Sequence, residues 1–160
     1  MIDDAVRSEM MRRAIEIARR SAESGGGPFG AVVVGAEGTI VAEGANAVTA
    51  SNDPTAHAEI VAVRAACAVR KTFELGRHEI FTSCEPCPMC LGAIHWARLG
   101  RIWFAADRHD AAAAGFDDDL LYREFKLPFD KRHTPIARLL AEEGKAPFEA
   151  WDRNGAKVRY

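Results

Sequence analysis

Two short segments with metal-binding residue types constrain the fold of this chain more than any other feature. The first is His57-Ala58-Glu59 and the second is Pro86-Cys87-Pro88-Met89-Cys90. One imidazole and two thiolates provide three zinc ligands, one fewer than a closed tetrahedral site requires. A site of this kind admits water, which zinc converts into a nucleophile near neutral pH. The chain must therefore fold so that both segments meet around one ion, and we expect a hydrolytic enzyme.

The spacing within each segment predicts different roles for its residues. Cys87 and Cys90 are one helical turn apart, so both sulfurs can reach one ion from the start of a helix. A helix N-terminus also lowers the pKa of a thiol, which favours the thiolate that zinc needs. His57 is expected near the start of another helix. Glu59 is expected to carry protons and not to bind zinc, because residues two apart on a regular helix point to nearly opposite sides. An irregular first turn would bring both to the metal.

Cys84 leaves two other metal sites open. It extends the two motif cysteines to an evenly spaced set of three. With His57, that set would form a closed structural zinc site, or it would hold part of an iron–sulfur cluster. Against both, Cys84 is predicted to end a strand, whereas Cys87 begins a helix. Cys67 lies in an apolar helical pattern, which favours a core position and leaves a cluster one ligand short. We therefore favour a catalytic zinc site.

Composition favours a single soluble domain over residues 1–160. The chain has 160 residues, of which 48% are hydrophobic and 28% charged, and a formal net charge of −2. That charge counts against a nucleic-acid partner, which usually needs a basic surface. No apolar run approaches the ~20 residues that span a membrane. The start, Met1-Ile2-Asp3-Asp4, lacks the apolar core of a signal peptide. We expect a cytoplasmic protein without membrane or nucleic-acid partners.

The hydrophobic pattern predicts an α/β protein, specifically a three-layer α/β/α sandwich with a mixed sheet. A stripe at helical spacing is expected to face the core from the first helix, and it comprises Met11, Ile15, Ala18 and Ala22. Helices are expected over residues 4–22, 55–69, 87–98 and 116–125. Strands are expected over residues 31–34, 39–43, 79–83 and 101–105, the first two forming a hairpin.

The motifs together resemble the cytidine deaminase-like superfamily. The segments that carry this resemblance are Pro28-Phe29-Gly30-Ala31-Val32, Asn46, Thr55-Ala56-His57-Ala58-Glu59 and Cys84-Glu85-Pro86-Cys87-Pro88-Met89-Cys90. Other segments resemble bacterial guanine deaminases within that superfamily, and they are Ser51-Asn52-Asp53-Pro54, Leu91-Gly92-Ala93-Ile94, Trp96-Ala97-Arg98, Ala114-Gly115-Phe116-Asp117-Asp118 and Tyr160. This likeness covers almost the whole chain, from about Arg12 to Tyr160.

The resemblance implies a chemistry and a fold. It implies a cytidine deaminase-like sandwich whose mixed sheet has five strands. One zinc ion per chain would be held by His57, Cys87 and Cys90, with Glu59 as the proton shuttle. The reaction would convert guanine to xanthine and ammonia.

The resemblance also implies substrate contacts and an assembly. Phe29 and Trp96 would flank the purine ring, while Asn46, Asp118 and Tyr160 would contact its polar edges. A segment of about residues 129–160 would cross to the second subunit of a domain-swapped homodimer. From the residues alone, helix capping is the alternative role of Asp118, for which we favour substrate binding, and turn formation is an equally suitable role for Asn46. Glu124 is a further candidate acid.

Three alternatives remain open at this point. A tRNA adenosine deaminase or a cytosine deaminase would share the zinc residues, and a zinc-stabilised binding module without catalysis belongs to a different class. Guanosine or triazines are further possible substrates. Ammonia release from a panel of bases separates these alternatives.

Overall fold

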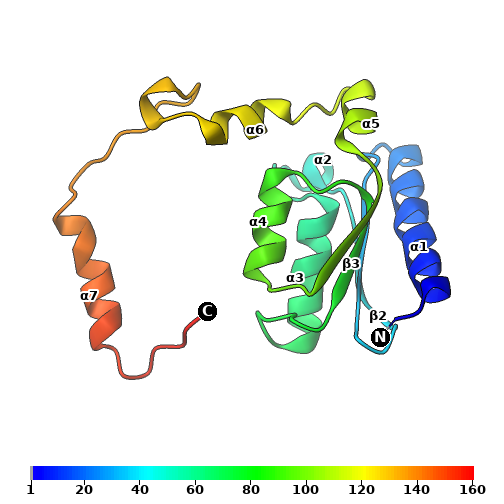
Figure 1. Ribbon diagram of the computed structural model, residues 1–160, viewed down its shortest axis with the longest axis horizontal. Helices are drawn as coiled ribbons and strands as arrows, with labels where there is room; N and C mark the ends of the chain where they lie inside the picture. Colours follow the sequence, from blue (N-terminus) through cyan, green and yellow to red (C-terminus); the bar gives the residue numbers. More distant parts are fainter. Residues whose placement is uncertain (1) are drawn as a thin grey trace. The chain divides into compact units, whose positions relative to one another are not determined.

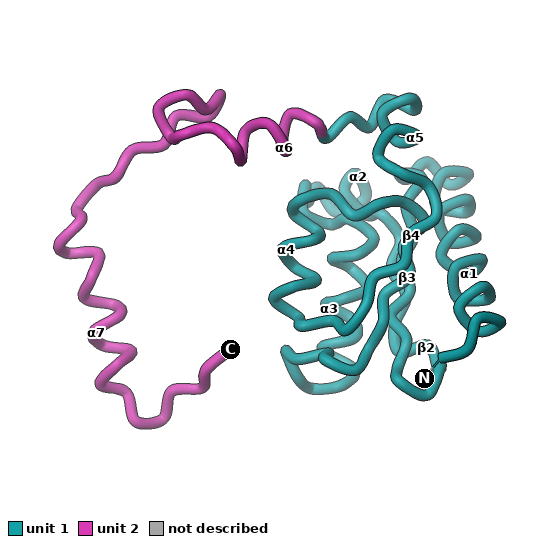
Figure 2. The backbone as a smooth tube through the Cα atoms, in the orientation of Figure 1, with its two compact units in different colours: residues 1–118 teal, residues 119–160 magenta. Residues whose placement is uncertain are grey.

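The computed structural model describes residues 2–160, so Met1 of the predicted acidic start lies outside the described residues. The chain divides into two compact units at Asp118 and Asp119, shown in different colours in Figure 2. The first unit contains the sheet and both metal-binding segments. The second unit, Asp119–Tyr160, contains short helices only. Among residues 2–160, no helix is both long and apolar enough to cross a membrane.

A mixed sheet with the strand order β2-β1-β3-β4 forms the centre of the first unit. Its strands are β1 (Gly30–Val34), β2 (Ile40–Ala45), β3 (Glu79–Cys84) and β4 (Arg101–Ala106). β1 and β2 pair as the predicted antiparallel hairpin, β1 is also antiparallel to β3, and β3 and β4 are parallel. Because β1 runs opposite to both neighbours, the other three strands share one direction. Their carboxyl ends therefore lie at one edge of the sheet.

The α/β class and the mixed sheet are confirmed, but the prediction of five strands was wrong. The described residues form four strands. After β4 the chain enters α5 (Arg108–Ala113) instead of another strand. Asp107 caps this helix by accepting hydrogen bonds from the amides of His109 and Asp110, and the Asp110 side chain accepts one from the Asp107 amide. This capping box and the alanines that follow it favour helix over strand.

Helices cover both faces of the sheet (Figure 1). α1 (Asp4–Glu23) lies on one face, whereas α3 (Ala58–Arg70) and α4 (Pro88–Trp96) lie on the other. All of β1 is buried, and its side chains alternate between the layers as strand geometry requires. Val32 and Val34 belong to the core beneath α1, while Ala31 and Val33 belong to the core beneath α3 and α4.

Close backbone contact explains why the predicted stripe on α1 was right at Ala18 but wrong at Ile15 and Ala22. The helix buries Met10, Ala14, Ala18 and Ser21, whereas the predicted core residue Ile15 is 44% exposed. A Cβ atom at Gly30 of β1 would collide with the carbonyl oxygen of Ala14 and would lie 2.7 Å from the amide of Ala18. The helix therefore rests directly on the strand, and only small side chains fit on the contacting face.

The same kind of contact fixes α3 against β2. A Cβ atom at Gly44 would collide with the carbonyl oxygen of Ala58 and would lie 2.6 Å from the amide of Ala62. Ala58 is the first residue of α3, so the contact with Gly44 holds the start of this helix against the sheet. Real Cβ atoms do not tolerate such approaches, so glycine is required here by packing. The start of α3 is where the histidine of the predicted metal site lies.

The second unit has little core of its own. It consists of α6 (Asp119–Lys126), α7 (Ala146–Arg153) and two single 3-10 turns, η1 (Phe129–Lys131) and η2 (Glu143–Lys145). None of its residues is buried. Its exposed large hydrophobic side chains include Leu139 at 85%, Phe148 at 73% and Val158 at 64%. A segment with so much exposed apolar surface is expected to pack against another surface.

Candidate active site

The start of α3 resolves how His57 and Glu59 can both face one ion. His57 is the N-cap of the helix, with extended backbone dihedral angles (φ −66°, ψ 155°), and Glu59 lies in the first turn. The objection that residues two apart point to opposite sides holds only inside a regular helix. Because His57 lies outside the helical geometry, its imidazole and the Glu59 carboxylate can both reach the same place.

The second segment is built in the same way. Cys87 is the N-cap of α4, also extended (φ −65°, ψ 167°), Pro88 opens the helix, and Cys90 lies in the first turn. Proline suits this position because its missing amide hydrogen has no partner at a helix start. α4 follows β3 directly, and α3 follows β2 after the short helix α2 (Val48–Ser51). The carboxyl ends of β2 and β3 lie at the same edge of the sheet. The topology therefore brings both helix starts together.

The three predicted ligands form one cluster. The Nδ1 atom of His57 lies 3.6 Å from the sulfur of Cys87 and 3.6 Å from the sulfur of Cys90. The ligand atoms of His57, Cys87 and Cys90 all lie within 4.8 Å of one another, and among residues 2–160 these three residues form the candidate metal site. Two sulfurs and one imidazole nitrogen suit zinc, whose bonds to sulfur and nitrogen are about 2.3 and 2.0 Å long. The donor set and its spacing thus fit a zinc ion.

Cys84 does not belong to this cluster. It is the last residue of β3, and its thiol points to the carbonyl oxygen of Asp107 at 3.6 Å. Burial raises the pKa of Cys84 to about 11, and its sulfur does not belong to the group of ligand atoms formed by His57, Cys87 and Cys90. Cys67 lies on α3 and is half-buried beside the core. The closed zinc site and the iron–sulfur cluster therefore find no support in the described residues.

The electrostatics of the cluster favour metal binding. A hydrogen bond from Cys90 lowers the pKa of Cys87 to about 4, and a hydrogen bond to His57 acts in the same direction. The hydrogen bond with Cys87 in turn raises the pKa of Cys90. The Cys87 sulfur therefore favours the thiolate form, which is the form that binds metal. Zinc binding would release any thiol proton that remains.

Glu59 is a buried carboxylate beside the cluster. Its residue surface is only 8% exposed. Desolvation on burial raises the pKa of Glu59, the negative charge of Cys87 adds to this, and His57 opposes it. A carboxyl group whose pKa is moved toward neutrality is suited to accept and return protons during a reaction. Its position outside the set of ligand atoms agrees with a role in proton transfer.

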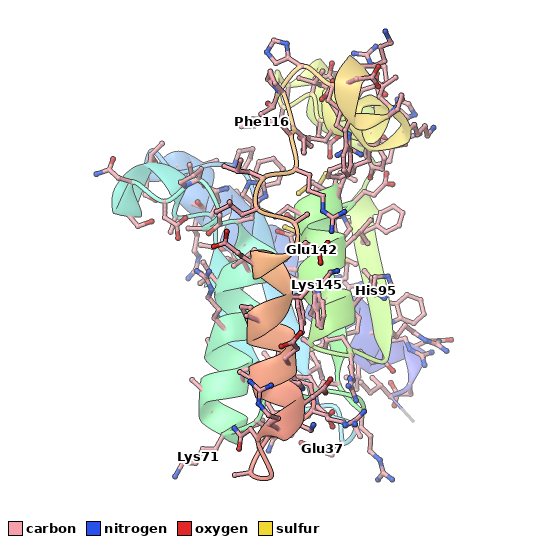
Figure 3. All side chains as sticks on the ribbon, turned by 90° about the vertical axis from the view of Figure 1, so that its left-hand side faces the viewer. Glu37, Lys71, His95, Phe116, Glu142 and Lys145 are labelled. Carbon is pink, nitrogen blue, oxygen red and sulfur yellow. The ribbon has the colours of Figure 1, made fainter. Side chains whose placement is uncertain are left out.

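A cavity of about 530 Å³ opens onto the cluster. It lies wholly within the first unit, at the end where α3 begins. Figure 3 shows Phe116 at this end of the unit and Lys71, which follows α3, at the opposite end. The cavity is lined by Gly25, Gly26, Gly27, Phe29, Asn46, Val48, Thr49, His57, Glu59, Cys84, Glu85, Cys87, Arg108, Ala111, Gly115, Phe116, Asp117 and Asp118.

Comparison with known families gives this site its class. Residues 5–106 match the family described as the cytidine and deoxycytidylate deaminase zinc-binding region. The chain belongs to this zinc-dependent deaminase family. The match includes the start of α3 and the start of α4, so it covers all three residues of the metal cluster together with Glu59.

Two relatives and one solved structure are similar to this deaminase. It is 48% identical over 151 residues to a guanine deaminase of Bacillus subtilis, covering 94% of this chain and 96% of the relative. The X-ray structure of guanine deaminase from Bacillus subtilis superposes with a TM-score of 0.94 at 46% identity and covers 99% of both chains. A tRNA-specific adenosine deaminase of Haemophilus influenzae is 39% identical over 122 residues, covering 71% of this chain and 70% of the relative.

The deaminase cavity brings together three of the five predicted substrate residues. Phe29 lies in the wall and packs edge-to-face against Phe116, with ring centroids 5.0 Å apart. Asn46 lies just beyond β2, and its amide oxygen accepts a hydrogen bond from the Val48 amide at 3.3 Å. Asp118 also lines the cavity, and burial raises the pKa of its carboxyl group.

The other two, Trp96 and Tyr160, are not among the residues that line this cavity. Trp96 is the last residue of α4, and its side chain is 69% exposed. Six residues separate it from Cys90, which is about 9 Å along a helix axis, so it lies away from the helix start that holds the metal. Tyr160 belongs to the second unit, where its ring packs edge-to-face against Trp151 with centroids 6.4 Å apart.

Several lining residues were not predicted as functional. Phe116 supplies a second aromatic wall, and Glu85 accepts a hydrogen bond from the backbone amide of Arg108 at 3.1 Å, which ties the α4 side of the cavity to α5. The sequence did contain a signal for both residues, because Phe116 and Glu85 lie within segments that carry the family resemblance. Glu124, the further candidate acid, accepts two hydrogen bonds of 3.0 Å from the His133 amide in the second unit.

Proposed function

We propose that this chain catalyses the hydrolysis of guanine to xanthine and ammonia. The observation that carries the proposal is the cavity in which a zinc-binding cluster and a buried acid, Glu59, meet Asn46, Asp118 and the Phe29 ring. Likeness to a guanine deaminase over 94% of the chain supports guanine as the substrate. The tRNA-specific adenosine deaminase covers less of the chain and is less similar.

His57, Cys87 and Cys90 are the residues that would hold zinc. When bound, zinc supplies a water molecule whose pKa falls from 15.7 to about 7. The ligands are fixed before binding, because both helix caps and the contact of Gly44 with α3 set their backbone positions. Preorganisation of this kind reduces the ordering that metal binding must impose.

Glu59 moves the protons of the reaction. It accepts one from the water that adds to the amine-bearing carbon and delivers it to the neighbouring ring nitrogen. It then passes the second water proton to the departing amine, which leaves as ammonia. Guanine plus water thus gives xanthine plus ammonia, with no other reactant. One carboxyl group acts as base and then as acid, which suits a pKa raised by burial.

The walls of the cavity would orient the base. Phe29 and Phe116 offer aromatic surface for a flat ring. The N1–H and the exocyclic amine of guanine are donors, so the Asp118 carboxylate is a suitable acceptor. A side chain that contacts only an edge of the base leaves the reacting carbon accessible to water and to Glu59.

We further propose that the chain works as a homodimer in which the C-terminal segment, about residues 129–160, packs on a second copy. The support is the exposed apolar surface of the second unit, whose residues are nowhere buried. On this proposal Tyr160 and the exposed Trp96 would act at the site only through such an assembly. A cytoplasmic location and the absence of nucleic-acid partners remain predictions of the sequence.

Ammonia release from a substrate panel tests the proposed function. The panel contains guanine, guanosine, cytosine, a triazine and a tRNA stem-loop with adenosine. We expect guanine to be turned over best, with xanthine as the product, and Cys87→Ala to lose zinc and activity together. Cys67→Ser, away from the cluster, is the matched control. Preference for the stem-loop would instead indicate a tRNA adenosine deaminase, and inactivity toward all substrates would indicate a zinc-stabilised binding module.

A further inference from the structure

The loop Gly25-Gly26-Gly27 lies against the side chain of Asn46 at the wall of the cavity. A Cβ atom built on Gly27 would lie 2.9 Å from Cγ, 3.0 Å from Oδ1 and 3.3 Å from Nδ2 of Asn46. These are the three atoms of the amide group that faces the cavity wall. The first distance is closer than real Cβ atoms approach, so a methyl group here would force the amide to shift.

Backbone conformation does not explain glycine at position 27. Gly25 has a positive φ of +88°, which side chains rarely adopt, but Gly27 lies outside that region. An alanine at position 27 could therefore take the same backbone angles. What it could not do is leave the Asn46 amide in its place.

Asn46 is held on its other sides by the backbone. Its backbone N–H donates to the carbonyl oxygen of Phe29 at 3.1 Å, and its side-chain Oδ1 accepts from the Val48 backbone amide at 3.3 Å. Oδ1 is engaged in this way, and Nδ2 is the donor of the same side-chain amide. The Asn46 side chain thus offers a donor in a fixed orientation, bounded by Gly27 on one side and Val48 on the other.

We propose that Gly27 is a positioning residue for substrate recognition. Its missing side chain gives the Asn46 amide the space to lie flat against the loop, with Nδ2 aimed at a hydrogen-bond acceptor on the edge of the bound base. The proposal rests on the proposed function, because it takes the ligand of this cavity to be a purine base. A shift of a few tenths of an ångström lengthens one hydrogen bond to the base and leaves the zinc ligands where they are.

A double-mutant cycle tests the contact and its consequence. The variants are Gly27→Ala, Asn46→Ala and the double variant, with Gly76→Ala as the control. A Cβ atom at Gly76 makes only an ordinary contact, 3.7 Å from the carbonyl oxygen of Arg98. Asn46→Ala removes the three atoms that a methyl group at position 27 would meet. The two substitutions should therefore be strongly non-additive.

Two readouts are taken from each protein as purified with zinc. In steady-state kinetics, Gly27→Ala should raise KM for guanine about three- to tenfold, the range of one weakened hydrogen bond, with a smaller change in kcat. In the Asn46→Ala background it should change KM less than twofold. In thermal unfolding, the fall in Tm caused by Gly27→Ala should likewise shrink when Asn46 is alanine. Zinc content should stay at one ion per chain throughout.

The two readouts separate this inference from the proposed function. Equal effects of Gly27→Ala on Tm in both backgrounds would show that the contact with Asn46 is not the reason for glycine. Non-additive Tm values with additive KM values would show a contact without a role in recognition, which also overturns the inference. If the wild-type protein releases no ammonia from guanine, the proposed function fails and the assignment of Gly27 to base recognition fails with it, whereas the Tm cycle still decides whether Gly27 holds Asn46.

Discussion

Replacing Glu59 by glutamine isolates the proton-transfer step from metal binding. Glutamine has the same shape but cannot take up or return a proton at neutral pH. The three ligand atoms belong to His57, Cys87 and Cys90, so zinc should remain bound. Because the carboxylate is almost completely buried and desolvation raises its pKa, exchanging it for a neutral group should not lower Tm.

The size of the effect follows from the number of transfers assigned to this side chain. A single positioned acid or base contributes about 10² to 10⁴ in rate. Glu59 is the buried carboxylate beside the cluster and would serve in both directions, so we expect kcat to fall by about 10⁴ or more. A factor of 10⁴ corresponds to about 5 kcal/mol in the activation barrier. KM should change much less, because the loss falls on the chemical step.

Xanthine formation, zinc content and Tm are measured on the same preparation. Glu85→Gln provides the matched control, since Glu85 lines the same cavity and uses its carboxylate to accept from the Arg108 amide, as glutamine also can. It should keep most of the activity. Activity of Glu59→Gln within tenfold of the wild type, or loss of its zinc while Glu85→Gln retains the metal, would refute the assignment of Glu59 as a proton shuttle.

Three further predictions concern other parts of the chain. Cys84→Ser should retain one zinc ion and most activity, measured by metal analysis and ammonia release; loss of both would return Cys84 to the metal site. Truncation after Lys157 should lower activity far more than Tm, while Tyr160→Phe, which keeps the ring, separates the hydroxyl from the packing; unchanged kinetics of the truncated enzyme would remove the tail from the site. Glu43→Gln should lower stability at pH 7 by about 0.5–1 kcal/mol, because the Arg13 guanidinium donates hydrogen bonds to Glu43 at 2.6 and 2.8 Å and holds its pKa below the usual 4.5. A depressed carboxyl pKa stabilises the fold above the unfolded value, so in urea titrations the difference should fade as pH drops below about 4.5, and a constant difference would contradict the pair as its source.

Local sequence rules predicted the metal cluster well because its geometry is local. Pro88 and the i, i+3 spacing mark the start of α4, and the helix does begin there. The order of strands and helices then placed the two helix starts at one sheet edge. The remaining question, how His57 and Glu59 face one ion, depended on a single N-cap residue. The sequence indicated that the first turn of α3 must be irregular, but it could not show that His57 adopts the extended conformation of an N-cap.

The close packing of α1 on the sheet was harder to predict, because a periodic hydrophobic pattern does not show how closely a helix approaches a strand. The stripe on α1 was assigned to Met11, Ile15, Ala18 and Ala22, yet of these the helix buries Ala18, and it turns Ala14 to the sheet where Ile15 was expected. Gly30 is the reason, since it lets the strand touch the helix backbone. A glycine in a buried strand followed by small residues on a neighbouring helix is the signal that would have corrected the assignment.

The first unit contains all the residues assigned to the reaction, but only some of the residues assigned to substrate recognition. The reaction depends on four residues at two helix starts, all in the first unit: His57, Glu59 and Cys87 line the cavity, and Cys90 completes the ligand cluster behind it. On the proposed function, the substrate depends on contacts with the base: Asn46 and Asp118 line the cavity, Trp96 lies in the same unit but does not line it, and Tyr160 belongs to the second unit. A truncation that removes Tyr160 should therefore change which bases are accepted before it abolishes deamination. If the truncated enzyme lost all substrates equally, the tail would serve to close the cavity against water, and discrimination would belong to Asn46 and Asp118.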